Sequence, residues 1–403
     1  MPQLSTNSIS YKALSDHKAV RYTQSLVGIP SVTPEDGGCQ DWVNEKLAAL
    51  GFSIDCWRVE GVTNTLAVLG QGAKRLAFAG HTDVVSPGDI RRWRHNPFDA
   101  VINEGLLMGR GAVDMKSGLA VMLAALGSHV EQYGVPSALQ YQFLMTSDEE
   151  GEAEFGTREI VEKLKLRDLV PDYCLIAEPT AARSSGDTIR IGRRGAISCR
   201  VRFSGKQGHV AYPGDTCNAV DLAAEAIAVL TSLPWDSGCD DFPGTSLQVT
   251  WINSGAFVDN LVPGECELCF NVRFSHRYSV NEIKQTIELA LFERLRGRQD
   301  TLWQLEWDRY CEPYFTPAGL DDSLIAKVER AVLSETGKYP CLSSSGGTSD
   351  GRFLASDRTQ VVELGLPNAT IHQVNEHARL EDIVSLYQIY RKLLLEFSGV
   401  YED

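Results

Sequence analysis

Residues 139–152 read LQYQFLMTSDEEGE, a strand-like run that ends in three consecutive acids. The run begins with apolar and polar side chains in alternation, which is typical of a half-buried strand. Adjacent carboxylates repel one another, and burying them is costly unless a positive charge lies between them. The acids at 148–150 therefore indicate either a solvated loop tip or a site for a cation, and the rest of the chain has to decide.

A rhythm of strand and helix continues on both sides of this run. Strands are predicted at 53–58, 64–69, 75–80, 139–146 and 173–177, and helices at 16–27, from Lys116 to a stop at Gly134, and at 157–166. A helix at 321–336, a strand near 360–364 and a closing helix at 380–397 resume the pattern. This alternation predicts an α/β fold with a mixed, mainly parallel sheet and flanking helices.

The character of the chain changes near Gly195. Strongly alternating strands are predicted at 197–205, 245–253 and 265–275, and helices at 218–233 and 280–297. Two helices on such a sheet predict an inserted α+β sandwich domain at 195–308. It interrupts a first domain made of residues 1–194 and 309–403.

The composition limits the class of partner. The chain has 403 residues, of which 43% are hydrophobic, and a net charge of −15. That charge argues against nucleic acid and anionic membranes as partners. We find no secretory signal pattern and no apolar run long enough to span a bilayer. The ten cysteines are mostly scattered singly, which favours core thiols in the reducing cytoplasm over a zinc ribbon built on Cys266 and Cys269.

Acid and imidazole side chains recur where predicted strands end. His81 and Asp83 close the strand at 75–80, Glu178 follows the strand at 173–177, and His372 follows the last strand. Asp114 lies in a glycine-rich turn before a helix. Each signal is weak alone, because a hydrogen-bonded core histidine or a helix cap explains it as well. In a parallel sheet, however, these ends share one edge, where sites form.

The charges of this edge decide between a loop tip and a cation site. Asp83, Asp114, Glu149, Glu150 and Glu178 would together carry five negative charges. Without cations, several of them would have to hold protons at neutral pH. Two divalent ions would bring the cluster near neutrality, and mixed imidazole and carboxylate ligands suit Zn²⁺, with Co²⁺ or Mn²⁺ as substitutes. One glutamate of the 149–150 pair can then bind metal while the other stays free as a base.

Eight segments in one order resemble the M20 family of dinuclear zinc amidohydrolases. They are GHTDVV (80–85), GRGAVDMKSG (109–118), TSDEEGE (146–152), AEPT (177–180), IGRRGAI (191–197), GKQGHVAYP (205–213), SGGTSDGRF (345–353) and NATIHQVNE (368–376). The long blocks at 191–213 and 345–376 point to the desuccinylase branch of that family. The resemblance implies a zinc-peptidase-like catalytic domain with an inserted dimerisation or lid domain.

The resemblance also implies a role for each residue of the edge. Asp114 would bridge two Zn²⁺ ions per subunit, with His81 and Glu178 completing one site, and Glu150 and His372 the other. Asp83 would support His81. Glu149 would act as general base and then as general acid.

Further roles implied by the resemblance fall in both domains. His209 would reach into the active site of a second copy in a homodimer and help to stabilise the oxyanion. The substrate, an N-acyl amino acid, would contact the residues Arg193, Tyr212, Asn260, Arg273, Gly347, Thr348 and Asn368. Cationic Arg193 and Arg273 suit a substrate that carries carboxylates.

Other interpretations stay open at this point. The residues from Gly347 to Gly351 satisfy the GxSxG pattern of serine hydrolases, although no apolar strand precedes them. A non-catalytic metal-stabilised binding protein and a sibling deacetylase, aminoacylase or dipeptidase share the same ligands. Two residues depart from the family pattern. They are Asp259, where a second Asn is expected, and His377, although the pattern around 372 selects His372 as the ligand.

Overall fold

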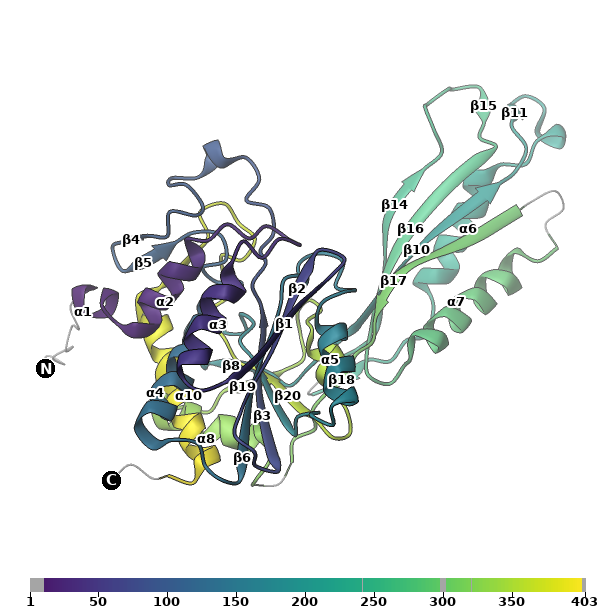
Figure 1. Ribbon diagram of the computed structural model, residues 1–403. Helices are drawn as coiled ribbons and strands as arrows, with labels where there is room; N and C mark the ends of the chain where they lie inside the picture. Colours follow the sequence, from purple (N-terminus) through teal and green to yellow (C-terminus); the bar gives the residue numbers. More distant parts are fainter. Residues whose placement is uncertain (1–10, 241, 298–301, 320, 401–403) are drawn as a thin grey trace, which may run out of the picture. The chain divides into compact units, whose positions relative to one another are not determined.

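The computed structural model describes residues 11–240, 242–297, 302–319 and 321–400, and its contacts divide the chain into two compact units (Figure 1). The first unit comprises Met1–Ile191, Thr316–Ser343 and Ser349–Asp403, and the second Gly192–Phe315 and Ser344–Thr348. The sequence-based domain limits of 195 and 308 stay a prediction. Strand β17 (Leu302–Cys311) crosses residue 308, because its pairing with the second unit's sheet continues to Cys311.

A mixed eight-stranded sheet forms the centre of the first unit. Its strands, in spatial order, are β1 (Ser53–Val59), β2 (Val62–Leu69), β6 (Leu139–Thr146), β3 (Lys74–His81), β7 (Tyr173–Ile176), β20 (Gln360–Glu363), β8 (Thr188–Arg190) and β19 (Cys341–Ser343). The central strands β6, β3, β7 and β20 run parallel, whereas β1, β2 and β6 pair antiparallel. The predicted mixed, mainly parallel sheet is confirmed.

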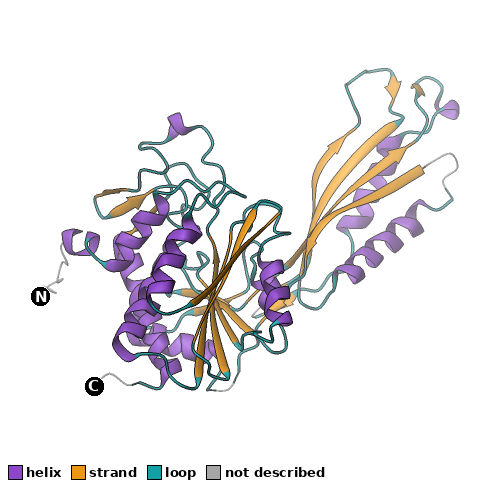
Figure 2. Cartoon of the chain, in the orientation of Figure 1, coloured by secondary structure: helices purple, strands orange, loops and turns teal. Residues whose placement is uncertain are grey.

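Helices cover this sheet (Figure 2). They are α1 (Tyr11–Ser15), α2 (Lys18–Val27), α3 (Cys39–Ala49), α4 (Lys116–Tyr133), α5 (Thr157–Leu166), α8 (Leu324–Thr336), α9 (Gly351–Leu354) and α10 (Leu380–Ser398). Figure 1 shows α5 on the other side of the sheet from α4 and α10. A small sheet of β4 (Val101–Asn103), β5 (Leu106–Met108) and β21 (His377–Arg379) completes the unit.

The prediction that residues 139–146 form a half-buried strand is wrong about burial. All eight of its residues are buried. The Gln142 amide nitrogen donates to Leu169 O at 2.8 Å and to Gln140 Oε1 at 3.1 Å, whereas Gln142 Oε1 and the Tyr141 hydroxyl are buried without a hydrogen bond. The acids that follow β6 therefore start from a strand in the middle of the core.

Helix α4 is buried almost all the way round and packs against β3 and the end of β7. The close approach depends on Gly118. A Cβ built there would lie 2.4 Å from Ala177 O, next to Glu178. Only glycine lets the helix come this near to the strand end.

Replacing Gly118 with alanine is expected to lower the free energy of unfolding by about 1–3 kcal/mol, because the new methyl group meets rigid backbone. Gly127→Ala on the same helix is the matched control. Its Cβ would lie 3.4 Å from the nearest atom, an ordinary contact with Leu50, so the helix propensity of alanine should leave stability unchanged or higher. Urea unfolding of both variants measures the difference, and equal stabilities would contradict the packing argument.

The second unit is a four-stranded antiparallel sheet with two helices. The strand order is β14 (Ser246–Asn253), β16 (Glu265–Phe274), β10 (Gly195–Ser204) and β17, and the helices are α6 (Ala219–Thr231) and α7 (Val280–Leu295). Alternate residues of β10 and β16 point to one face and form a core with the two helices. The short strand pairs are β11 (Gly208–His209) with β15 (Leu261–Val262), β12 (Gly238–Cys239) with β13 (Phe242–Pro243), and β9 (Gly192–Arg193) with β18 (Tyr314–Phe315).

Among the described residues, we find no helix with the length and apolar character needed to cross a bilayer.

Candidate metal centre

The register of the parallel strands brings three acidic or imidazole segments to one edge. His81 is the last residue of β3 and lies beside Thr146, the last residue of β6. Ala79 pairs with Ile176 of β7, so that Glu178, two residues further on, reaches the level of His81. The acids at 148–150 follow Thr146 directly. The carboxyl ends of the sheet thus gather these side chains as their position after each strand predicts.

Two groups of potential ligands meet at Asp114. In the first, His81 Nε2 lies 3.3 Å from Asp114 Oδ1 and 3.5 Å from Glu178 Oε1. In the second, His372 Nε2 lies 3.4 Å from Asp114 Oδ2 and 2.9 Å from Glu150 Oε1. The ligand atoms of each group lie within 4.8 Å of one another. The two oxygens of Asp114 therefore face different histidines, which is the arrangement of a bridging carboxylate.

Asp83 is fully buried and serves two purposes. Its backbone carbonyl lies 2.8 Å from His81 Nδ1, which fixes the ring and leaves Nε2 directed at the ligand group. Its carboxylate accepts hydrogen bonds from the backbone N–H groups of Glu149 at 3.3 Å and Glu150 at 3.1 Å. Asp83 therefore links the histidine to the loop that carries the two glutamates.

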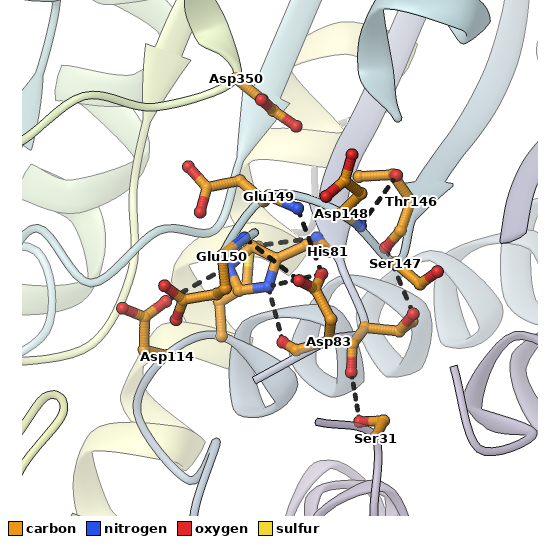
Figure 3. A network of polar contacts seen from close by, with 12 residues as sticks. Ser31, His81, Asp83, Asp114, Thr146, Ser147, Asp148, Glu149, Glu150 and Asp350 are labelled. Atoms are coloured by element: carbon orange, nitrogen blue, oxygen red, sulfur yellow. Dashed lines mark hydrogen bonds and ion pairs between the residues drawn. The ribbon is translucent and has the colours of Figure 1, made fainter. Parts of the chain in front are cut away.

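The three consecutive acids of the opening segment have three different environments (Figure 3). Asp148 is buried and accepts from the N–H groups of Glu152, Glu154 and Phe155, so it anchors the loop after β6. Glu150 joins the second ligand group. The Glu149 carboxylate makes no hydrogen bond or ion pair within the described residues. The anchoring role of Asp148 has no counterpart in the sequence-based predictions, because the pattern alone does not separate it from its neighbours.

The electrostatics of this cluster are those of a site rich in negative charge. Burial raises the pKa of Glu149 well above its usual range, and the charge of Glu178 raises it further. Burial together with Asp114 raises the pKa of Glu178 to about 7. Hydrogen bonds with Asp114 and Glu150 raise the pKa of His372 to about 10. Like charges held this close favour bound protons or bound cations.

The donor set fits divalent metal ions. His81 Nε2 and Asp114 Oδ1 are buried and have no hydrogen-bond partner, although both face the same point. An unpaired buried polar atom is costly, and a cation between the two would satisfy both. Imidazole nitrogen with carboxylate oxygen is a donor combination typical of zinc and related ions.

One set of predicted substrate contacts lies where β10 begins. Buried Arg193 directs its guanidinium at the segment 344–348, with Nη1 at 3.5 Å from the carbonyl oxygens of Ser345 and Gly347. Thr348 is the next residue. Gly346 has a positive φ, and a Cβ there would lie 2.5 Å from Arg193 Nη1. Arg273 lies at the same end of the sheet, opposite Ala196, and donates to Asn271.

A second set lies at the other end of the same sheet (Figure 1). His209 pairs with Leu261 in the β11–β15 ladder, and Asn260 O accepts from Val210 N at 3.1 Å. The rings of His209 and Tyr212 lie 5.9 Å apart, and both side chains are exposed. Strands β10 and β16 pair over ten residues between the two sets, which corresponds to about 30 Å. The second unit therefore does not bring His209 close to Arg193.

The remaining predicted positions have simple local settings. Asn368 lies in the first unit and donates its N–H to Ala181 O at 3.0 Å. Ser349 is buried and accepts a hydrogen bond from Gly351 N, so it is engaged at the start of α9 and unlike an exposed nucleophile. Asp259 is exposed in the turn before β15. His377 is directed at Asn375 O and belongs to neither ligand group.

Comparisons with known proteins bear on the family of this chain. Residues 77–396 match the profile of Peptidase family M20/M25/M40. The chain is 56% identical over 378 residues, covering 94% of it and 100% of the relative, to succinyl-diaminopimelate desuccinylase 2 of Shewanella loihica. Its fold is similar to an M20 family metallo-carboxypeptidase from Sulfolobus solfataricus, with a TM-score of 0.77, 15% identity and coverage of 95% and 100% of the two chains.

A second solved structure of similar fold is a dinuclear metal-binding peptidase of the M20 family from Bacillus subtilis, with a TM-score of 0.71, 13% identity and coverage of 96% and 99%. The family resemblance predicted from the motifs is confirmed by the profile match and by the close relative. The chain belongs to Peptidase family M20/M25/M40.

Proposed function

We propose that this protein hydrolyses N-succinyl-L,L-diaminopimelate with water to succinate and L,L-diaminopimelate, a step of diaminopimelate and lysine biosynthesis. The observation that carries the proposal is the 56% identity, over 94% of the chain, to a relative named for this activity. The reaction breaks one amide bond. The water oxygen goes to the succinyl carbonyl carbon, and the departing nitrogen gains a proton.

Two Zn²⁺ ions per subunit are the proposed cofactors, with Co²⁺ or Mn²⁺ as substitutes. His81 and Glu178 would hold one ion, Glu150 and His372 the other, and Asp114 would contribute one oxygen to each. Bound divalent ions would make a water molecule more acidic and polarise the amide carbonyl. The two buried atoms without a hydrogen bond at this point, His81 Nε2 and Asp114 Oδ1, support the assignment.

Glu149 is the proposed general base and acid. Its carboxylate is free of hydrogen bonds within the described residues and lies on the loop held by Asp83. It would take a proton from the attacking water and return it to the leaving amine nitrogen, because a base must recover its starting state in each turnover. Asp83 holds the backbone of both glutamates and thereby keeps base and ligand in fixed relation.

The substrate carries several carboxylates, and the proposed substrate contacts include cationic side chains that can bind them. Arg193 and Arg273 have the forked guanidinium geometry that matches carboxylate oxygens. Gly347, Thr348 and Asn368 would complete the pocket for the acyl and amino acid parts of the substrate. Tyr212 and Asn260 would be added to this pocket together with His209. Asp259, beside Asn260, is available to the ammonium end of the substrate.

We further propose that the protein works as a homodimer in which His209 of one copy stabilises the oxyanion in the active site of the other. The two sets of predicted substrate residues lie at opposite ends of the ten-residue pairing of β10 and β16. One small substrate cannot contact both ends of a single second unit. Strand β14 is an edge of this sheet and exposes Trp251 and Ile252, which suits pairing with a second copy.

A complementation experiment tests the exchange of His209. His209→Ala and Glu149→Gln proteins are each expected to be nearly inactive. After subunit exchange, half of the dimers are mixed, and each mixed dimer contains one intact site. Activity should then recover to about a quarter of the wild-type rate. No recovery in a mixture shown by mass to contain mixed dimers would rule out the proposed role of His209 in the partner.

A substrate panel on zinc-loaded protein tests the activity itself. N-succinyl-L,L-diaminopimelate should be hydrolysed with a kcat/KM at least about 100-fold above that of N-acetylornithine, an N-acyl amino acid or a dipeptide, because a site built for a charged group rejects analogues that lack it. Preference for one of the other three compounds would assign the protein to a sibling activity. No turnover of any of them would favour the non-catalytic interpretation.

A cytoplasmic location is also proposed. All ten cysteines are free thiols in the structure, which suits a reducing compartment.

A further inference from the structure

A buried ion pair joins the two loops that carry Asp114 and His372. Arg110 Nη1 lies 2.6 Å from Glu376 Oε2, and the two residues are 2% and 0% exposed. Arg110 begins the turn that leads to Asp114, and Glu376 ends the segment that follows His372. Neither residue belongs to a ligand group. The pair therefore lies next to the candidate metal centre without being part of it.

Glu376 holds the backbone of the Asp114 turn. Its Oε1 accepts from Val113 N at 2.8 Å and from Asp114 N at 3.2 Å, and its Oε2 accepts from Gly111 N at 3.1 Å. Three N–H groups of one turn thus converge on a single carboxylate. A carboxylate with this many donors is strongly held, and in return it fixes the conformation of the turn.

Arg110 holds the backbone of the His372 segment. Its guanidinium donates to Gln373 O and to His372 O, each at 3.4 Å, and lies 5.2 Å from the centre of the Trp93 ring, which supports its plane. His372 itself has a φ of 58°, a left-handed conformation that costs a residue other than glycine free energy. Contacts from elsewhere in the fold must hold it there.

We propose that Arg110 and Glu376 are positioning residues that fix the Asp114 and His372 loops against each other and so set the metal affinity of the site formed by Asp114, Glu150 and His372. This inference rests on the two-ion centre of the proposed function. Two of the three ligands of that site lie on the loops joined by the pair, whereas the other site takes only Asp114 from them. The side chain of His372 is 48% exposed and that of His81 is 1% exposed, so His372 depends more on such support.

The pair is therefore expected to act on the two sites unequally. Loss of a group that orients metal ligands typically weakens binding about 10–100-fold. We expect that factor at the site of Glu150 and His372, and a change of no more than about threefold at the site of His81 and Glu178. A purely structural role would weaken both sites alike or neither.

Titration of the metal-free full-length protein with Co²⁺ tests this. Wild-type protein should bind two ions, and His372→Ala and Glu178→Gln serve as references for loss of either site. Glu376→Gln turns an amide toward N–H donors, and Arg110→Lys keeps the charge but not the fork that reaches His372 O. Both variants should keep the ion at the site of His81 and Glu178. They should bind the ion at the site of Glu150 and His372 about 10–100-fold more weakly.

A matched control is Asp236→Asn in the second unit. Asp236 also holds a loop, since it accepts from Gly238 N and Thr245 N, and it belongs to the other unit than the ligand loops. The Asp236→Asn protein should bind both ions with unchanged affinity.

Equal weakening of both sites in the Arg110 and Glu376 variants, or no weakening in either, would overturn the inference. Thermal unfolding without metal should be measured to check that each variant is folded. If Glu376→Gln does not fold, Arg110→Lys, which retains the buried charge, still tests the inference. Wild-type protein that binds no metal would instead contradict the proposed function.

Discussion

Replacing Asp114 with alanine is expected to remove both bound ions and to lower kcat/KM by at least about 10³-fold, since bound metal supplies several kcal/mol of transition-state stabilisation. The structure explains why one residue has this effect. Its two oxygens lie 3.3 Å from His81 and 3.4 Å from His372, so each ligand group loses a member. Among the described residues, Asp114 alone belongs to both groups.

Metal content per subunit and hydrolysis of N-succinyl-L,L-diaminopimelate should be measured on the same preparation. Treatment of wild-type protein with a chelator should reproduce the loss, and addition of Zn²⁺ or Co²⁺ should reverse it in the wild type only. Asp89→Ala is a suitable control because Asp89 pairs with Arg91 on an exposed turn of the same unit. Two retained ions together with a full rate in Asp114→Ala would end the interpretation of this cluster as a metal centre.

Replacing Glu149 with glutamine is expected to lower kcat by about 10²–10⁴-fold, the contribution typical of general acid–base catalysis, while both ions remain bound. Glutamine keeps the size of the side chain but cannot take up a proton. The backbone of residue 149 stays tied to Asp83 in either case, so the loop should keep its conformation. The loss should therefore appear in kcat with little change in KM.

The control for this prediction is Glu152→Gln, which changes an exposed glutamate three residues further along the same loop. Its activity should equal that of the wild type. If Glu149→Gln raised KM and left kcat intact, Glu149 would be a substrate-binding residue and not a proton carrier. If it released an ion, the residue would belong among the ligands, and Glu150 would need a new assignment.

Much of the fold was accessible from local pattern. The strands before His81, Asp148 and Glu178 end where apolar runs meet polar residues, and the structure places their ends together. Strand β17 was not predicted. Alternation of Trp303, Leu305 and Trp307, which pack against the core of the second unit, is a signal by which it could have been found. Helix α3 was also missed, although its second half, from Glu45 to Ala49, consists of residues with strong helix preference.

The sequence by itself determined the kinds of candidate ligand, their order along the chain and their place after strands, because strand ends follow from periodicity and parallel strands share a carboxyl edge. Only the tertiary structure decided which oxygen of Asp114 faces which histidine, and that Asp148 anchors the loop. It alone revealed that Arg110 meets Glu376, 266 positions further along the chain. Local pattern extends over a few residues, whereas contacts between distant loops depend on how helices and strands pack.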